Sequence, residues 1–428
     1  MNIRLAFGRD GLQVKLPSGF HWRVLDARSG EALSHPEAAI GRALDNPIAG
    51  EPLRQLAARK RSAAIAVCDI TRPVPNRLML PPLLERLHQG GIAREAVTIV
   101  IATGLHRSAT PQELEEILGP EIAGSYRVVN HDARQIGEHR SLGKTRSGTS
   151  VWIDERFMAA ELHITCGLIE PHLMLGFSGG RKLIAPGMAY QDTIRELHSP
   201  RFMRDPKAVE GSIEGNTLHR ELLEIAQMAC HDFMLDVAIT RDRKISGVFA
   251  GHGPDAHDEG MAYVSNVMMH QLEQPMDAAI TTAAGYPLDL TFYQAIKGVT
   301  AAARIVRPGG RILLMAACAE GPGSADFSAL LRDGCSAPDF LNRITKAPVV
   351  VDQWQLEKLA LVARDIEVLY YVPGLPGDYH QALWGRVFGN PENAIAALVD
   401  GLAPHAEIAI MPDGPYVLAQ AMEQAGVA

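Results

Sequence analysis

Short runs of continuous apolar residues, separated by stretches with helical spacing, constrain the fold of this chain more than any other feature. A run that is apolar at every position is typical of a parallel strand covered on both faces. Parallel strands need long crossover connections, which helices usually supply. The sequence therefore predicts an α/β fold with mainly parallel sheets. The clearest runs are Ser62–Ile70, Ala96–Thr103, Leu162–Ile169, Asp277–Ala283, Arg311–Ala317 and Glu407–Met411.

Local signals place helices and hairpins around these runs. The stretch Thr110–Glu113 combines a capping threonine, a proline in the first turn and a glutamate three residues on, which predicts a helix start. A second helical pattern covers Asn216–Met228. Met1–Leu16 alternates polar and apolar residues about two glycines, as a β-hairpin does. Gly137–Thr149 is polar and turn-rich, which indicates a loop or a hairpin.

A domain boundary is predicted near Gln271–Met276, where a long helical pattern ends and a new strand begins. We expect a first, cofactor-binding α/β domain over 1–273 and a second α/β domain over 274–404. Residues 405–428, with a last strand and a predicted helix at Tyr416–Ala425, are a candidate for completing the first domain.

Charge, hydropathy and cysteine usage exclude several classes of protein. The chain has 428 residues and a net charge of -8, so no cationic excess favours nucleic acid as a partner. No window approaches the roughly 18 apolar residues of a membrane span. Its five cysteines form no CxxC pair, and an odd count is a poor disulfide framework. We expect a protein of a reducing compartment, the cytoplasm.

Polar clusters follow three of the predicted strands. Asp69–Arg72 comes after the first, Gly104–His106 after the second and Glu170–His172 after the third. Ligands of open α/β sheets bind beyond the carboxyl ends of strands, so the three clusters together indicate a site. Each cluster by itself is better explained as turn chemistry, with Asp69 as an Asx-turn acceptor.

Other segments are ambiguous when taken singly. The glycine-rich stretch Gly176–Lys182 lacks Walker spacing, and its lysine alone is explained as a surface residue. His198 ends a short helical stretch, where a histidine commonly complements the helix dipole. Tyr293, Gln294 and Lys297 share one helix face, which is either a binding face or a solvated one. Trp354 follows an apolar run and by default belongs to the core.

Taken in order, these segments resemble the signature segments of the nickel-dependent lactate racemase family. The matching stretches are Asp69–Pro73, Gly104–Arg107, Glu170–His172, Gly179–Lys182, Leu197–His198, Tyr293–Gly298 and Asp352–Trp354. The resemblance implies two α/β domains with the active site in a cleft between them. It also implies a racemase or epimerase that inverts C2 of a 2-hydroxy acid.

The resemblance further implies roles for single residues. A nickel-pincer nucleotide, a pyridinium mononucleotide with two thio-acyl arms, would be joined covalently to Lys182, with His198 as the protein ligand of nickel. His106 and His172 would serve as acid and base. The substrate contacts would be Arg72, Lys297, Tyr293, Gln294 and Trp354. The cofactor contacts would be Asp69, Thr71, Gly104, Ser178 and Gly179. Cofactor-synthesis enzymes would be partners.

The residue types suit this chemistry. A soft, sulfur-rich site with one imidazole favours square-planar nickel. Direct deprotonation of C2 beside a carboxylate is difficult, so a hydride moving to the cofactor and back is the easier route, with imidazoles handling the hydroxyl proton. The substrate stays open between lactate and larger acids such as malate or a sugar acid. Arg201 and Arg204 are either contacts for a second anionic group or surface residues.

Two other functions are consistent with parts of the chain. The stretch Val306–Leu314 resembles a helix-to-strand turn of methyltransferases and dehydrogenases, although no GxGxxG follows a strand. A nucleotide-dependent dehydrogenase or methyltransferase would therefore bind a dinucleotide or S-adenosylmethionine. A non-catalytic relative would bind a hydroxy acid without carrying cofactor on Lys182. The combined set of Lys182, His106, His172 and His198 argues against a pure binder.

Overall fold

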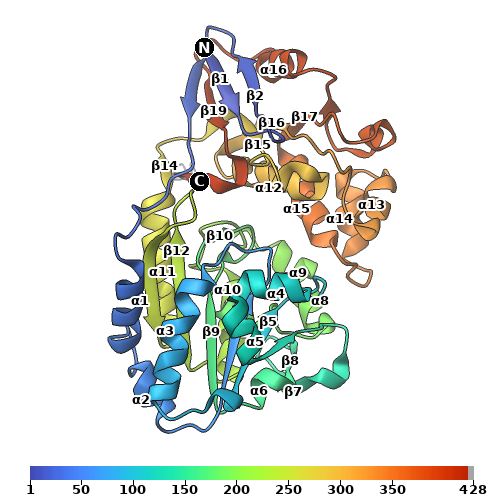
Figure 1. The fold of residues 1–428 in the computed structure, drawn as a ribbon. Helices are drawn as coiled ribbons and strands as arrows, with labels where there is room; N and C mark the ends of the chain where they lie inside the picture. The colour runs from blue at the N-terminus through green and yellow to red at the C-terminus, as the bar shows by residue number, and fades with distance from the viewer. Residues whose placement is uncertain (423–428) are drawn as a thin grey trace. The chain divides into compact units, whose positions relative to one another are not determined.

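The computed structural model describes residues 1–422, which divide into two compact units. Unit 1 comprises Met1–Arg28, His198–Arg204 and Met268–Ala428, the last six residues of which lie outside the described part. Unit 2 comprises Ser29–Leu197 and Asp205–Val267. Figure 1 shows the chain as a ribbon and labels many of its helices and strands.

This division differs from the predicted one at both ends of the chain. The strand β3 (His21–Val24) pairs in parallel with β19 (Glu407–Met411), and β19 pairs in turn with β15 (Met276–Thr282). Residues 1–28 therefore belong to unit 1. The described part of 405–428 also belongs to unit 1 and does not complete the other unit. Such long-range strand pairing leaves no mark in the local pattern of either segment.

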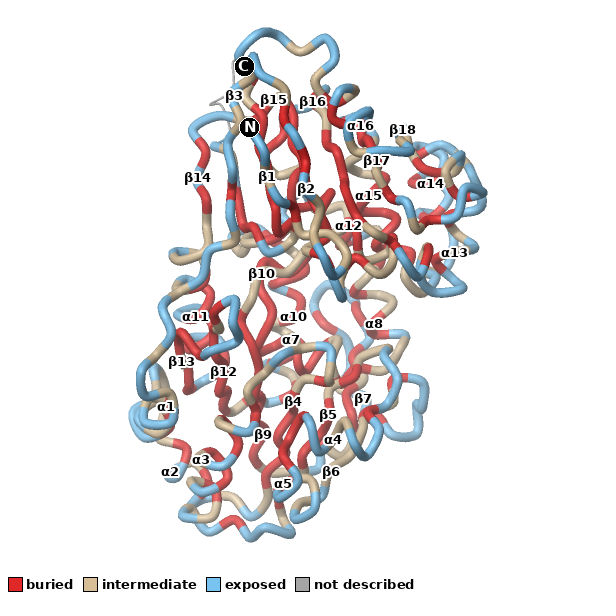
Figure 2. The backbone as a smooth tube through the Cα atoms, turned by 45° about the horizontal axis from the view of Figure 1, so that its top comes forward, coloured by how far each residue is buried: buried red, intermediate tan, exposed pale blue. Residues whose placement is uncertain are grey.

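Unit 2 is built on a six-stranded sheet that is parallel except for one edge strand. Its interior strands are almost wholly buried, as Figure 2 shows for the central part of this unit. The predicted runs after Ser62, Ala96 and Leu162 are confirmed as three of these strands. In spatial order the strands are β13 (Ile245–Gly251), β12 (Phe233–Ile239), β9 (Leu162–Leu168), β4 (Ala63–Cys68), β5 (Val97–Ala102) and β6 (Arg127–Asn130).

Helices cover both faces of the unit 2 sheet. On one face Ile65 and Ile99 pack in one apolar cluster with α1 (Pro36–Asp45), α2 (Leu53–Ala57) and α3 (Asn76–Gln89). On the other, α6 (Glu155–Met158) and α7 (Arg181–Ile184) contact the central strands. The other α-helices of unit 2 are α4 (Pro111–Leu118), α5 (Pro120–Ser125), α8 (Gln191–Leu197), α10 (Thr217–Met228) and α11 (Gly253–Met268).

Local signals in unit 2 gave correct boundaries. The capping box predicted at Thr110 is present, with its hydroxyl accepting from the Glu113 amide at the start of α4. The turn-rich stretch after Gly137 forms part of a hairpin of β7 (His139–Lys144) and β8 (Ser150–Asp154). Near the sheet, β10 (Pro171–His172) and β11 (Gly176–Phe177) form a second, very short antiparallel pair.

Unit 1 has a six-stranded parallel sheet of its own. Alternate residues of each strand face opposite sides, so Ile312 and Leu314 pack with one set of helices and Leu313 packs on the opposite face. In spatial order the strands are β18 (Arg386–Val387), β17 (Glu367–Tyr371), β16 (Val306–Met315), β15, β19 and β3. The stretch Val306–Leu314 lies within β16, but the pairing register with β15 shifts between Val306 and Arg311, so residues 307–309 form an exposed irregularity of the strand.

The two faces of the unit 1 sheet are covered differently. The first face carries α12 (Phe292–Ala303), α13 (Ala325–Arg332), α14 (Ala337–Ile344) and α15 (Gln353–Asp365). The second carries α16 (Pro391–Val399) and the predicted N-terminal hairpin, formed by β1 (Asn2–Leu5) and β2 (Leu12–Lys15).

Near the end of the described chain, the predicted helix at Tyr416–Ala425 is wrong over the residues that the structure shows. The strand β20 (Ala419–Ala421) pairs in parallel with β14 (His270–Leu272) instead. The last three residues of that predicted helix lie outside the described residues. All five cysteines lie in the described part and are free thiols. No helix within residues 1–422 is both long and apolar enough to cross a membrane.

Candidate active site

The direction of strand addition reverses in unit 2 between β4 and β9. From β4 the chain adds β5 and β6 on one side, then returns to place β9 and β12 on the other. Ligands of open α/β sheets bind at the carboxyl ends of the strands at such a point. Asp69 follows β4 directly, and Glu170 lies two residues after the end of β9. The strand-end clusters predicted from the sequence thus surround this position.

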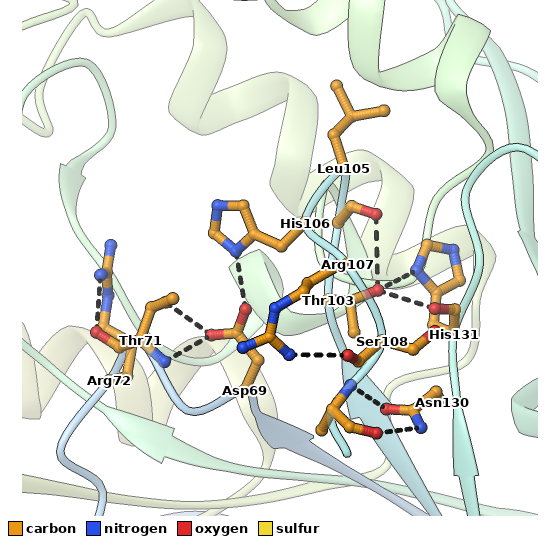
Figure 3. Close-up of polar contacts among 12 residues, drawn as sticks. Asp69, Thr71, Arg72, Thr103, Leu105, His106, Arg107, Ser108, Asn130 and His131 are labelled. Atoms are coloured by element: carbon orange, nitrogen blue, oxygen red, sulfur yellow. Dashed lines mark hydrogen bonds and ion pairs between the residues drawn. The ribbon is translucent and has the colours of Figure 1, made fainter. Parts of the chain in front are cut away.

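Asp69 and His106 form a close polar pair in this region, shown in Figure 3. The Asp69 carboxylate lies 2.6 Å from Nδ1 of His106, and its other oxygen accepts from the Thr71 hydroxyl at 2.6 Å. A carboxylate can only accept, so Nδ1 carries the proton and Nε2 stays available as a base. Burial raises the pKa of Asp69, but hydrogen bonds from His106 and Thr71 outweigh it and hold that pKa below its ordinary value.

The loop that carries His106 is tied to the segment that carries Lys182. The Gly104 amide donates to the Gly187 carbonyl at 2.9 Å, and the Gly187 amide donates to the Lys182 carbonyl at 3.0 Å. Gly104 has a φ of +56°, which an L side chain rarely adopts. The loop that carries His106 and the segment that carries Lys182 are far apart in sequence, and these backbone hydrogen bonds hold them together.

Arg72, the predicted carboxylate contact, is held by a neighbouring acid. Its Nε lies 3.0 Å from Oε1 of Glu170, and both side chains are about a third exposed, at 30% and 31%. Its Nη1 donates to the Thr71 carbonyl. These contacts orient the guanidinium group beyond the carboxyl end of β4, where it could bind a carboxylate through two hydrogen bonds. The sequence indicated Glu170 only as part of a motif, and its contact with Arg72 was not predicted.

His172 lies on the short hairpin arm β10, opposite Gly176 of β11. The chain continues from β11 into Ser178 and Gly179, the next two predicted contacts. Ser178 is buried, and its hydroxyl is engaged with the backbone at both ends of the loop: it donates to the Leu168 carbonyl and accepts from the Glu170 amide. Its side chain therefore shapes the loop, and its predicted cofactor contact would have to come from the backbone.

A buried polar cluster packs against this loop, and its contacts were not predicted: Arg181, a candidate for favouring a larger substrate, is buried in it. The Gly180 amide donates to Asp236 at 2.7 Å, and Arg181 donates to Nδ1 of His257 at 3.0 Å. His257 in turn donates from Nε2 to the Ser178 carbonyl at 2.7 Å. Burial raises the pKa of Asp236 to about 7 and lowers that of Arg181 to about 9.

The glycines of the Lys182 loop are required by this cluster. A Cβ at Gly179 would stand 2.3 Å from the Asp236 carboxylate, and Gly179 has a φ of +87°. A Cβ at Gly180 would stand 3.2 Å from the His257 ring. The glycine-rich stretch is therefore a close backbone approach to buried polar groups, with Lys182 at its end.

Unit 1 holds the other predicted substrate contacts around the start of α12. Tyr293 is hydrogen-bonded with Asp352 and Trp354; burial and the Asp352 charge together raise the pKa of its phenol. Gln294 and Lys297 follow on the same helix. The structure thus brings the two predicted segments, Tyr293–Gly298 and Asp352–Trp354, into contact.

The imidazole of His198 packs against the indole of Trp354, with ring centroids 4.5 Å apart and planes inclined by 46°. Both residues belong to unit 1. Of the two arginines that follow, Arg201 is exposed and lies over the Phe202 ring. Arg204 is partly exposed and pairs with the buried Glu357, so it is not a ready contact for a substrate anion.

The residues present fit a nickel-pincer nucleotide. Burial raises the pKa of the Cys68 thiol to about 12; the charges of Arg72 and Lys182 oppose this rise, whereas those of Asp236 and Asp69 add to it, so cations and anions both act at the end of β4. The Gln294 side-chain oxygen is buried and meets no hydrogen-bond donor within residues 1–422. The same residues contain no group of three His, Cys, Asp or Glu that could bind a metal. The family resemblance implies a single protein ligand of nickel, His198, so a cluster of three ligands is not expected.

Two family models match the chain. Residues 7–211 match the lactate racemase N-terminal domain, and residues 271–419 match the lactate racemase C-terminal domain.

Individual relatives agree with the family models. The lactate racemase of Thermoanaerobacterium thermosaccharolyticum is 32% identical over 422 residues, covering 97% of this chain and 99% of that protein. The lactate racemase of Lactiplantibacillus plantarum is 34% identical over 390 residues, covering 89% and 90%.

Solved structures extend the comparison. The apoprotein structure of the Thermoanaerobacterium enzyme has a TM-score of 0.90, covering 98% of this chain and 100% of that one. A protein from Thermotoga maritima shares the fold with a TM-score of 0.65 at 16% identity, over 92% of this chain and 100% of that one.

Proposed function

This chain belongs to the lactate racemase family and is a racemase, and from that premise we propose that it inverts C2 of a 2-hydroxy acid with a nickel-pincer nucleotide joined to Lys182. The observation that carries the proposal is the Asp69–His106 pair, held by backbone hydrogen bonds to the segment of Lys182. An oriented base beside the attachment lysine is what this chemistry requires.

His106 is proposed to accept the hydroxyl proton of the substrate on Nε2. Its Nδ1 donates to Asp69, and Asp69 stays ionised because its pKa is lowered, so the carboxylate stabilises the imidazolium that forms. Racemisation needs an acid–base group for each of the two enantiomers, and His172 on β10 is the proposed second group.

Arg72 is proposed to bind the substrate carboxylate, with Glu170 holding its guanidinium in place. Lys297, Tyr293, Gln294 and Trp354 are the proposed contacts of unit 1 to the substrate. Because Arg204 is paired with Glu357, the case for a second anionic group on the substrate rests on Arg201 alone. Lactate is therefore the first substrate to test, followed by malate and sugar acids.

The cofactor would be held covalently by Lys182, through nickel by His198, and through the loops of Asp69, Thr71, Gly104, Ser178 and Gly179. When bound, the nickel-pincer nucleotide supplies the reversible removal and return of a hydride at C2. The chain orients the substrate, supplies the two imidazoles and binds the substrate carboxylate. Cofactor-synthesis enzymes are the partners that this proposal requires, and the cytoplasm, where free thiols persist, is the proposed location.

The test is to produce the chain together with cofactor-synthesis enzymes and to measure intact mass, the modified peptide, nickel content and chiral turnover of lactate. We expect an adduct of mononucleotide size on Lys182, about one nickel per chain, and interconversion of the two lactate enantiomers. Lys182→Arg keeps the charge and is expected to lose all three. Absence of adduct and nickel, in a host that loads a known lactate racemase, would contradict the cofactor proposal.

A further inference from the structure

The segment His198–Arg204 packs with unit 1, although the residues on either side of it belong to unit 2. It contains α9 (Pro200–Met203), and side chains of α15 hold it at its far end. Lys358 donates from Nζ to the Met203 carbonyl at 2.9 Å. Arg204 donates from Nε to Oε1 of Glu357 at 2.9 Å. Arg204 also donates to the Leu341 carbonyl of α14.

The Arg204–Glu357 pair is a buried contact and not a surface ion pair. The Glu357 side chain is 0% exposed and that of Arg204 is 32% exposed. Burial raises the pKa of Glu357, and the charges of Arg204 and Lys358 oppose that rise. Removing one partner of such a pair leaves a charge uncompensated in the interior, which is strongly unfavourable.

The near end of the segment meets the same helix. The His198 ring lies against Trp354, which precedes Glu357 by three residues and Lys358 by four. Residues at these spacings lie on one face of a helix. A single face of α15 therefore contacts the segment at both ends: Trp354 at His198, and Glu357 with Lys358 at Met203 and Arg204.

We propose that Glu357 and Lys358 are positioning residues that hold the imidazole of His198 in its orientation against Trp354. The inference rests on the proposed function in one respect, since it is as the nickel ligand that the orientation of His198 matters. Groups that orient a metal ligand typically change metal affinity by about 10–100-fold when removed. The same loss is expected here, although neither residue touches the metal.

The first test uses the full chain without cofactor and reads the emission of Trp354. To isolate that emission, the spectrum of the corresponding Trp354→Phe variant is subtracted from the spectrum of each protein. The subtraction removes the signal of the other tryptophans. His198→Ala is expected to change this emission in the otherwise unaltered chain. The same substitution is expected to have no effect in an Arg204→Met/Glu357→Met background, which removes both members of this ion pair together.

Lys358→Met and Glu357→Gln, made singly, repeat this test should the double variant fail to fold. Glu367→Gln is the matched control, because it breaks the ion pair of Glu367 with Arg311 elsewhere in unit 1. The emission response to His198→Ala should persist in that control. A response that also persists at full size in the Glu357 and Lys358 variants overturns the proposal, as does the lack of any response in the unaltered chain.

The second test measures nickel per chain after dialysis of the cofactor-loaded protein. We expect the Glu357 and Lys358 variants to retain nickel about 10–100-fold more weakly than Glu367→Gln, at similar melting temperature. Equal retention would overturn the proposal. If the unaltered chain holds no nickel at all, the proposed function fails, while the emission test still decides whether these residues position His198.

Discussion

The Asp69 carboxylate accepts a hydrogen bond from Nδ1 of His106 across 2.6 Å, and this contact determines which nitrogen of His106 can take a proton. The pair is asymmetric: the Asp69 side chain is 9% exposed and that of His106 is 61% exposed. The acid is thus part of the scaffold, and the imidazole presents its Nε2 side outward.

Asp69→Asn should therefore lower turnover more than substrate binding. An amide can donate to Nδ1, which would place the proton on Nε2 and remove the base. We expect kcat to fall by about 10²–10⁴-fold, the range of a positioned acid–base group, with a smaller change in KM. Steady-state kinetics with each lactate enantiomer measure this. Thr71→Val removes one donor to Asp69 but leaves His106 in place, so its effect should be under about tenfold. Full turnover in Asp69→Asn would exclude the proposed role of His106.

Arg72→Lys should weaken substrate binding. A lysine keeps the positive charge but lacks the planar fork that grips a carboxylate with two hydrogen bonds. A hydrogen bond to a charged group contributes about 1.5–3 kcal/mol, so KM for lactate should rise by about 10–100-fold. Glu170→Gln, which leaves the guanidinium but weakens its anchor, should raise KM less. A larger effect from Glu170→Gln than from Arg72→Lys would reverse these roles.

Gly298→Ala should destabilise unit 1. A Cβ at this position of α12 would stand 2.0 Å from the Thr282 carbonyl oxygen at the end of β15, so the helix would have to move. Overpacking of this kind typically costs about 1–3 kcal/mol. Thermal and urea unfolding measure the loss. Gly377→Ala meets nothing within 4 Å and serves as the control. Unchanged stability in Gly298→Ala would show that α12 is not held as closely as the structure has it.

The stability of unit 2 should fall in mild acid because of His131. This ring is fully buried, and burial lowers its pKa to about 4. Its Nε2 lies 3.0 Å from Nε2 of His139, while Nδ1 of His139 meets the Gln135 carbonyl. The unfolded chain takes up a proton near pH 6.5 and the folded chain does not until about pH 4. The stabilisation is complete above the higher value and is lost as pH falls between the two.

At about pH 5, this difference amounts to about 2 kcal/mol for His131 alone. The groups that act on His131 beyond burial are Asp154, His139, Arg156 and Asp132. Urea unfolding at about pH 7.5 and about pH 5 should show a smaller pH dependence for His131→Gln than for the unaltered chain. His21→Gln, an exposed ring in unit 1, is the control. An identical pH dependence in all three proteins would exclude His131 as the source.

Local pattern was sufficient for most elements of the fold, although not for the end of the described chain, where a strand stands in place of the predicted helix. The runs predicted as strands, such as Leu162–Ile169 and Glu407–Met411, became β9 and β19, because a strand buried on both faces is apolar at most of its positions. The helix start at Thr110 was equally readable, since a capping box involves residues only three apart. The polar residues at the strand ends were also identifiable in advance, because parallel strands bring their carboxyl ends to one sheet edge.

Tertiary structure alone decided which of those residues act on one another. The grouping of Met1–Arg28 with unit 1 depends on the pairing of β3 with β19, across most of the chain. The partners Asp69–His106, Arg72–Glu170 and Arg204–Glu357 join residues that are 37 to 153 positions apart. Local sequence specifies backbone conformation and burial, whereas the orientation of a charged side chain depends on which distant group the folded chain brings beside it.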